Sequence, residues 1–180
     1  SRTEGWFVGC PLTSRQMTEM PEEYVLKKII KAGKVAEKSG AKIVGLGAFT
    51  SVVGDAGITI AKNLNIAVTS GNSYTVATAL EGARQAAKVM GLSMDRANVV
   101  ILGATGSIGA ACAQILSREV RYLTLVARSE AKLEKVATQI FRSTGLAVKV
   151  TANTKSALRA ADIVIAVTSS VDTLIEPEDL

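Results

Sequence analysis

Three glycines at regular spacing follow an apolar run in the second half of the chain. After Val99-Val100-Ile101-Leu102 come Gly103, Ala104, Thr105, Gly106, Ser107, Ile108 and Gly109. Such a pattern is weak on its own, because 15 glycines occur in 180 residues. Its position is more informative, since a loop that leaves a buried strand and opens a helix directs backbone N–H groups toward a bound diphosphate. The segment therefore predicts a dinucleotide site, unless the glycines serve strand–helix packing alone.

Each glycine has a separate expected role in this loop. Gly103 permits the tight turn, Gly106 lets backbone N–H groups approach the pyrophosphate, and Gly109 allows the helix to pack closely against the strand. The positive end of the helix dipole would face the phosphates. The spacing G-x-x-G-x-x-G is a variant common among NADP enzymes.

The choice between NAD(H) and NADP(H) depends on the end of the second strand. An NAD-specific protein places a carboxylate there, about 20 residues after the glycines, for the ribose 2′-hydroxyl. This chain instead has Ala127, Arg128 and Ser129. A guanidinium can pair with a phosphate in a forked geometry and stack on adenine, while Ser129 adds a donor and Lys132 adds positive charge. The sequence therefore predicts NADP(H), the alternative being a solvated arginine at a strand end.

A later strand ends in Thr168 and Ser169. Ligands of open parallel sheets lie outside the carboxyl ends of the strands, so we expect these two residues near the nicotinamide. Hydroxyl residues at such positions are also ordinary turn formers.

The chain contains no histidine. This removes the commonest general base and the commonest neutral metal ligand, so we expect neither a Ser-His-Asp triad nor a metal site. Cys10 and Cys112 are too few for a disulfide scaffold and favour a reducing cytosol. We interpret both cysteines as core residues, because Cys is among the most buried residue types and nothing next to Cys10 would lower its pKa. No catalytic residue is identified.

Short apolar strands alternate with helices along the chain. The alternation predicts an α/β fold in which a Rossmann-like doubly wound parallel sheet is preceded by a smaller α/β domain. We expect a substrate-side domain over residues 1–91 and an NADP-binding domain, incomplete at its C-terminus, over 92–180. The chain is interpreted as a fragment, since it opens without Met and stops at what reads as a helix start. Expected helices span 21–39, 55–64, 73–90 (capped by Ser73), 107–117, 130–143 and 155–160; expected strands span 42–46, 66–69, 98–102, 123–127, 147–151 and 162–167.

Composition narrows the class of protein. Hydrophobic residues make up 48% and charged residues 21%, as in soluble globular domains, and no run of 18 apolar residues or signal peptide occurs. We therefore expect a cytoplasmic protein without a transmembrane segment, and a homo-oligomer is left open. A helical stripe of Lys27, Lys31, Lys34 and Lys38 is either a solvated face or a surface that steers an acidic partner such as an acyl carrier protein or a CoA phosphate. No nucleic-acid partner is expected, because aromatic interleaving is absent.

Four segments together resemble a known family. These are Gly47-Ala48-Phe49-Thr50-Ser51, then residues 69–75 (TSGNSYT), 102–109 (LGATGSIG) and 127–129 (ARS). In order and spacing they look like the long-chain acyl-[acyl-carrier-protein] reductases of cyanobacteria and related proteins labelled as predicted amino-acid or shikimate-type dehydrogenases. The likeness runs from about Cys10 to the C-terminus.

The resemblance implies that NADPH, in a cleft between two domains, reduces an acyl thioester to an aldehyde. It also implies a nucleophilic cysteine beyond residue 180, and it places Phe49, Thr50, Ser51, Gly71 and Asn72 beside the nicotinamide.

Two other functions stay open. One is a shikimate- or quinate-like, or amino-acid-type, NADP dehydrogenase that acts on a small alcohol or ketone. That family is expected to use a Lys–Asp pair, and Lys42 and Asp55 occur here without a matching motif. The other is a module that binds NADP(H) without catalysis.

Overall fold

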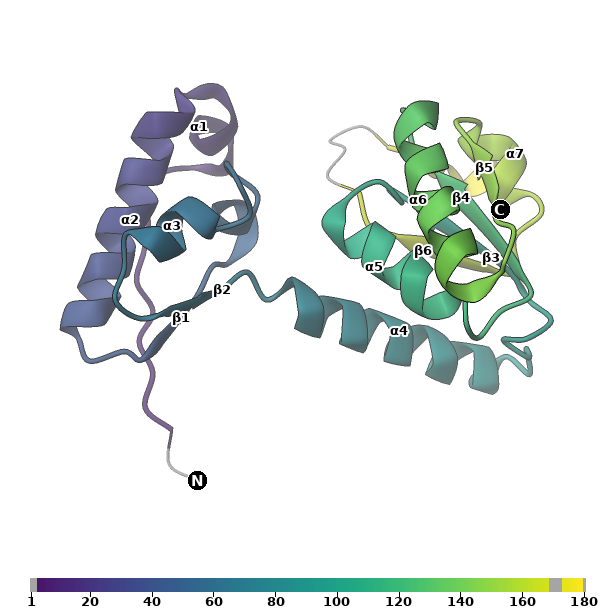
Figure 1. Ribbon diagram of the computed structural model, residues 1–180, viewed down its shortest axis with the longest axis horizontal. Coiled ribbons are helices and arrows are strands. Elements are labelled where there is room, and N and C mark those ends of the chain that lie inside the picture. The colour runs from purple at the N-terminus through teal and green to yellow at the C-terminus, as the bar shows by residue number, and fades with distance from the viewer. Residues whose placement is uncertain (1–2, 169–172, 180) are drawn as a thin grey trace. The chain divides into compact units, whose positions relative to one another are not determined.

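The computed structural model describes residues 3–168 and 173–179. The chain divides into two compact units, Ser1–Asn72 and Ser73–Leu180 (Figure 1). Both units alternate helices with parallel strands, so the α/β fold predicted from the sequence is confirmed. No helix within the described ranges is long and apolar enough to cross a membrane.

The first unit packs three helices around a parallel pair of strands. Its elements are α1 (Ser14–Glu19), α2 (Glu22–Lys38), β1 (Ile43–Gly45), the 3-10 turn η1 (Ala48–Ser51), α3 (Ile58–Lys62) and β2 (Ala67–Thr69). Val25 and Ile29 of α2 and Ile60 of α3 are buried and form its core with Leu46 and Leu64. Close packing fixes α2 against the segment after α3, because a Cβ on Gly33 would lie 2.6 Å from the Leu64 side chain.

The short helix α1 was not expected from the sequence. It begins with a capping box, in which the Gln16 N–H donates to Thr13 Oγ1 at 3.2 Å and the Thr13 N–H donates to Gln16 Oε1 at 2.9 Å. The pattern Thr-x-x-Gln is a known helix-start signal, so this element was detectable.

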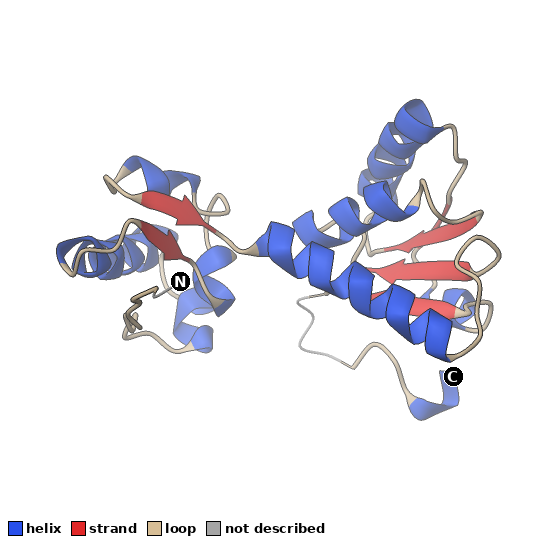
Figure 2. Cartoon of the chain, turned by 90° about the horizontal axis from the view of Figure 1, so that it is seen from below, coloured by secondary structure: helices blue, strands red, loops and turns tan. Residues whose placement is uncertain are grey.

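The second unit is built on one four-stranded parallel sheet (Figure 2). The strand order is β5-β4-β3-β6, in which β3 pairs with both β4 and β6. The elements are α4 (Asn72–Val89), β3 (Asn98–Leu102), α5 (Ser107–Leu116), β4 (Tyr122–Val126), α6 (Glu130–Thr144), β5 (Lys149–Thr151), α7 (Thr154–Leu158), β6 (Ile163–Ala166) and the 3-10 turn η2 (Pro177–Asp179).

Alternate residues of the central strand face two different cores, as a doubly wound sheet requires. Val99 and Ile101 join one core with apolar residues of α4, α5 and α6. Val100 and Leu102 join another with Ala157 and Leu158 at α7. These strands read as continuous apolar runs because both faces are covered.

The long helix α4 differs from expectation in two ways. It begins at Asn72, so Ser73 lies inside the helix and does not cap it; the Gly71 N–H donates to Thr69 Oγ1, and this turn brings the chain into the helix one residue earlier. The division of the chain also falls at Asn72/Ser73, ahead of the boundary expected at residue 91, because Val76 and Leu80 pack into the core of the second unit.

An ion pair fixes α4 to the loop after α5. Arg84 donates to both carboxylate oxygens of Glu119, at 2.9 and 2.7 Å, and these hydrogen bonds lower the pKa of Glu119 against the opposing effect of burial. The pair is one-third exposed, so we expect Glu119→Gln to lower the free energy of unfolding by only about 1 kcal/mol at pH 7. Because the folded-state pKa is depressed, this difference should be complete above the ordinary carboxyl pKa and vanish as the pH falls through the folded value. Denaturant titrations of both proteins between pH 3 and pH 7 check it; an unchanged difference at acid pH would contradict the assignment.

Candidate dinucleotide-binding site

The sheet of the second unit has a topological switch point at β3. The chain extends the sheet from β3 to β4 and β5 in one direction and then returns to place β6 on the other side of β3. Ligands of such sheets bind at the carboxyl ends of the strands beside the switch point. Here, the loops that follow β3 and β4 meet the first two residues after β6, Val167 and Thr168.

Hydrogen bonds and steric contacts hold these three segments together. The N–H groups of Gly103 and Ala104 donate to the Val126 carbonyl oxygen at 2.9 and 3.2 Å, which joins the glycine loop to the end of β4. On the other side, a Cβ on Gly103 would lie 2.5 Å from the Val167 carbonyl oxygen, after β6. Gly103 has φ +82°, in the left-handed region that favours glycine. Only glycine therefore fits the tight turn.

Gly109 is buried in the first turn of α5. A Cβ there would clash with the Gly103 carbonyl oxygen and lie 2.9 Å from Ala104 Cα. Both of these atoms belong to the backbone, which cannot move aside as a flexible side chain can. The glycine thus brings the start of α5 against the loop that it leaves.

A matched pair of Gly→Ala substitutions tests this packing. We expect Gly109→Ala to destabilise the second unit by about 2 to 3 kcal/mol, because backbone atoms must shift to admit the methyl group. Gly82, inside α4, has nothing within 4 Å of the position that an added methyl group would take, so Gly82→Ala should stabilise by about 0.5 to 1 kcal/mol. Thermal unfolding distinguishes the two; equal unfolding temperatures would contradict the clash.

Gly106 stands at the mouth of α5 under different constraints. It is the N-cap residue, with φ −77° and ψ 163°, and as a glycine it has no side chain with which to cap the helix. It is exposed, and a Cβ would meet only the Gly103 oxygen at 3.4 Å. The fold itself therefore accepts a side chain at this position. The residues around this helix N-terminus fit a dinucleotide, since a glycine without a side chain lets the ligand approach the backbone at the positive end of the helix.

The expected 2′-phosphate residues follow β4. Arg128 is exposed and lies two residues beyond Val126, the residue that binds the glycine loop. Ser129 is the N-cap of α6 and makes no side-chain capping bond, and Lys132 is exposed in the first turn of that helix. Glu130, also exposed in this turn, is a negative charge that an anion would have to avoid. The structure therefore brings Arg128, Ser129 and Lys132 together at one helix start.

Thr168 is the residue of the last expected cluster that the structure describes. It is exposed, and its Cα would lie 3.3 Å from a Cβ on Gly103. Ser169 lies outside the described residues.

The expected substrate-side residues all follow the carboxyl ends of the two strands of the first sheet. Phe49, Thr50 and Ser51 form η1 after β1, and Gly71 and Asn72 follow β2. Because Gly45 and Thr69 are paired at the ends of these parallel strands, both loops meet at one edge. Thr50 Oγ1 donates to the Gly47 carbonyl oxygen at 2.6 Å and Ser51 Oγ to that of Ala48 at 2.8 Å, so both hydroxyl protons stabilise the turn. Ala48 itself has φ +48°.

Asp55 and the two cysteines, the other groups that could take part in chemistry, have contacts that stabilise the fold. Asp55 accepts hydrogen bonds from the Thr59 N–H at 2.9 Å and the Thr59 hydroxyl at 2.7 Å, which lower its pKa and commit it to the start of α3. Burial raises the pKa of the Cys10 thiol, with Lys28 opposing, and burial also raises that of Cys112, which lies in the core. Neither cysteine is activated as a nucleophile.

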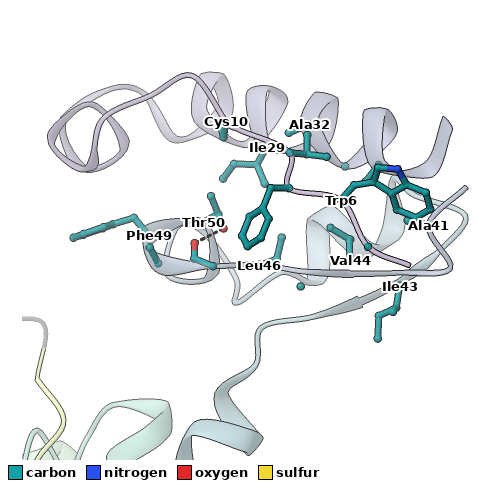
Figure 3. Close-up of a pocket in the computed structure, with 18 of the residues that line it drawn as sticks. Trp6, Cys10, Ile29, Ala32, Ala41, Ile43, Val44, Leu46, Phe49 and Thr50 are labelled. Atoms are coloured by element: carbon teal, nitrogen blue, oxygen red, sulfur yellow. Dashed lines mark hydrogen bonds between the residues drawn. The ribbon is translucent and has the colours of Figure 1, made fainter. Parts of the chain in front are cut away.

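A cavity in the first unit was missed by sequence reasoning (Figure 3). It measures about 920 Å³ and lies between the N-terminal segment, α2 and β1. Phe49 and Thr50 contribute to its wall, as do Trp6 and Phe7. The sequence held a signal for this cavity, because Trp6 and Phe7 are adjacent aromatics in a chain with only 4% aromatics. In the structure both of these side chains are exposed.

A parallel sheet with a glycine loop at its switch point defines a Rossmann-like nucleotide-binding protein. More particularly, residues 84–180 match the shikimate / quinate 5-dehydrogenase family, and the chain belongs to that family.

Two curated relatives are similar to this chain. A long-chain acyl-[acyl-carrier-protein] reductase of Synechococcus elongatus is 29% identical over 79% of the chain and 43% of its own length. The aminotransferase PigE of a Serratia species is 31% identical over 61% of the chain and 13% of its own length. The chain thus spans less than half the length of either relative.

Solved structures show lower similarity. A bulky-bulky ketone specific alcohol dehydrogenase from Comamonas testosteroni is 23% identical, with a TM-score of 0.36 over 39% of this chain and 33% of that one. A dipicolinate synthase from Bacillus halodurans is 16% identical, with a TM-score of 0.45 over 84% of this chain and 48% of that one. At these values neither structure informs the reaction.

Proposed function

We propose that this chain is part of an NADP(H)-dependent oxidoreductase that reduces a fatty acyl thioester to an aldehyde. The observation that carries the cofactor class is the glycine loop at the switch point, where Gly103 and Gly109 admit no side chain. Membership of a dehydrogenase family supports the same class. The thioester substrate rests on the similarity to the Synechococcus reductase.

The residues of the second unit have separate roles in this proposal. The N–H groups at the start of α5 bind the diphosphate, and Arg128 with Ser129 binds the 2′-phosphate. Thr168, which lies next to Gly103, contacts the nicotinamide in this proposal. NADPH, when bound, supplies a hydride to the thioester carbonyl carbon. The carbon–sulfur bond then breaks, one proton is taken up, and an aldehyde and a free thiol are released.

The competing reaction is oxidation of a small secondary alcohol, which membership of the shikimate / quinate family favours. The described residues offer little for it. Asp55 is held by Thr59 as a capping group, and Lys42 is exposed with no ion-pair partner among the residues described. We therefore place this reaction second.

An aldehyde assay separates these functions. The full-length protein that contains this chain is incubated with NADPH and a decanoyl thioester of acyl carrier protein or coenzyme A, and separately with NADP⁺ and shikimate. We expect decanal in step with NADPH oxidation, and no decanal from the Gly106→Val variant. NADP⁺ reduction with shikimate alone would favour the alcohol dehydrogenase, and NADPH binding without either turnover would indicate a non-catalytic module.

The partner proposed for the thioester is an acyl carrier protein. Along α2, Lys27 pairs with Glu23 at 2.8 Å, whereas Lys31, Lys34 and Lys38 are exposed without an ion-pair partner among the described residues. Reversing Lys31 and Lys34 to Glu should raise the KM for acyl carrier protein about tenfold at low salt, because complementary charge steers encounter. Lys88→Glu, at the end of α4, is the matched control. A KM that does not change, or changes equally for a small pantetheine thioester, would make the lysines a solvated face.

A further inference from the structure

The outer edge of β1 borders the cavity of the first unit. The wall of this cavity is mainly apolar and includes Trp6, Ile29, Ala32, Val44, Leu46 and Phe49. Figure 3 shows Val44 and Ile29 facing the hollow between α2 and β1, with Trp6 beside them and Ile43 turned away. Glu4 and Lys42 are the charged residues of the wall among those described.

Backbone groups of β1 at this edge have no hydrogen-bond partner in the part of the chain that the structure describes. The Ala67 N–H donates to the Lys42 carbonyl oxygen at 3.2 Å, and the Leu46 N–H donates to the Thr69 carbonyl oxygen at 2.8 Å. Residues of a parallel ladder alternate in direction, so the N–H and C=O of Ile43 and Gly45 point away from β2. Within residues 3–168 and 173–179, no hydrogen bond reaches these groups. Such groups favour a ligand with amides of its own.

We propose that the outer edge of β1 binds the pantetheine arm of the acyl thioester, an inference that rests on the proposed function. The arm is a linear chain in which amides alternate with short aliphatic units. Its amides can pair with Ile43 and Gly45 as a strand would, while its methylene groups contact the apolar wall. A peptide strand is the less suitable occupant, because β1 is only three residues long and offers just these two residues at its edge.

The residues at the two ends of β1 differ, and this difference gives the arm a direction. Lys42 is exposed at the amino end, where its ammonium can bind the phosphate of 4′-phosphopantetheine. Phe49 and Thr50 line the cavity at the carboxyl end, where the thioester then lies. The loop after β2 also begins at this carboxyl end, because Gly45 and Thr69 are paired there.

Two substitutions at Gly45 test the backbone pairing. A Cβ on Gly45 would meet nothing within 4 Å, so Gly45→Ala should leave the edge intact. Gly45→Pro removes the outward N–H, at an edge position where proline is tolerated. Trp6 lines the cavity and is the only tryptophan, so its fluorescence reports binding. We expect pantetheine to shift this emission in the wild type and Gly45→Ala, with about five- to tenfold weaker binding in Gly45→Pro.

A second comparison does not depend on the folding of the proline variant. 4′-Phosphopantetheine should bind about tenfold more tightly than pantetheine, and Lys42→Ala should remove that advantage. If coenzyme A binds with the same affinity as 4′-phosphopantetheine, we assign the arm to a carrier protein. If coenzyme A binds more tightly, we assign the arm to coenzyme A. Either result supports the site. No response to pantetheine, an unchanged affinity in Gly45→Pro, or a response to decanoate or a pentapeptide alone would overturn it.

NADPH titrations of the same variants keep this inference separate from the proposed function. Gly45→Pro and Lys42→Ala lie in the first unit, so their NADPH affinity should equal that of the wild type. Pantetheine binding without NADPH binding would contradict the cofactor assignment and leave the arm site standing. NADPH binding and aldehyde formation without a pantetheine response would overturn the arm site alone.

Discussion

Replacing Arg128 by alanine is expected to weaken NADPH binding by about 10- to 100-fold while changing NADH binding by less than about twofold. The difference arises because a charge-assisted hydrogen bond to a phosphate contributes about 1.5 to 3 kcal/mol, and NADH lacks the 2′-phosphate. Arg128 is exposed and follows the strand whose end holds the glycine loop, so its side chain is available to the adenosine end of the cofactor. Titration of each dinucleotide by its fluorescence measures both affinities.

Arg121→Ala is the matched control for that experiment. Arg121 is also exposed and next to β4, but it precedes the strand and stacks on Tyr122 at 5.6 Å. Its removal should leave both affinities unchanged. If Arg128→Ala lowered NADPH and NADH affinity equally, Arg128 would have no role in recognising the 2′-phosphate.

Replacing Gly106 by valine is expected to reduce the affinity for NADPH and NADH by more than about 100-fold. A branched side chain at the mouth of α5 would occupy the space in which the diphosphate meets the backbone N–H groups. The unfolding temperature should change little, because Gly106 has extended backbone angles that valine adopts readily and a Cβ there meets only one atom, at 3.4 Å.

Comparison with Gly109→Ala separates binding from folding. Gly109→Ala acts through a backbone clash and should lower stability, whereas Gly106→Val should abolish binding in a folded protein. Calorimetric titration with NADPH and thermal unfolding are recorded for both variants. Retained affinity in Gly106→Val would remove the loop from the binding site.

Periodicity in the sequence predicted the parallel elements of both units. The strand at Asn98–Leu102 was predicted to the residue, because a continuous apolar run between polar turns is typical of a strand buried on both faces. The domain boundary expected at residue 91 was based on the glycine after α4. That expectation did not take into account that Val76 and Leu80 of α4 join the core of the second unit. Helical periodicity shows which face of a helix is buried and not which core receives it.

The candidate site could be predicted as far as local chemistry extends. The tight turn at Gly103 was predicted from its place after a strand, and the structure adds that the same residue lies against Val167, which follows the distant strand β6. The direction of the Ile43 and Gly45 backbone groups, away from β2, could not be predicted, because strand pairing depends on contacts remote in sequence. The hydroxyls of Thr50 and Ser51 likewise looked free until their local bonds were seen.

The most direct test of the dinucleotide site is an amide NMR titration of this 18.8 kDa chain with NADP⁺. We expect the largest shift changes at the N–H groups of Gly106, Ser107 and Ile108, with smaller changes at Arg128 and Ser129. In the same titration with NAD⁺, the signals of Gly106, Ser107 and Ile108 should shift and those of Arg128 and Ser129 should stay nearly unchanged. Saturable changes confined to other residues, or no changes at millimolar NADP⁺, would contradict the site.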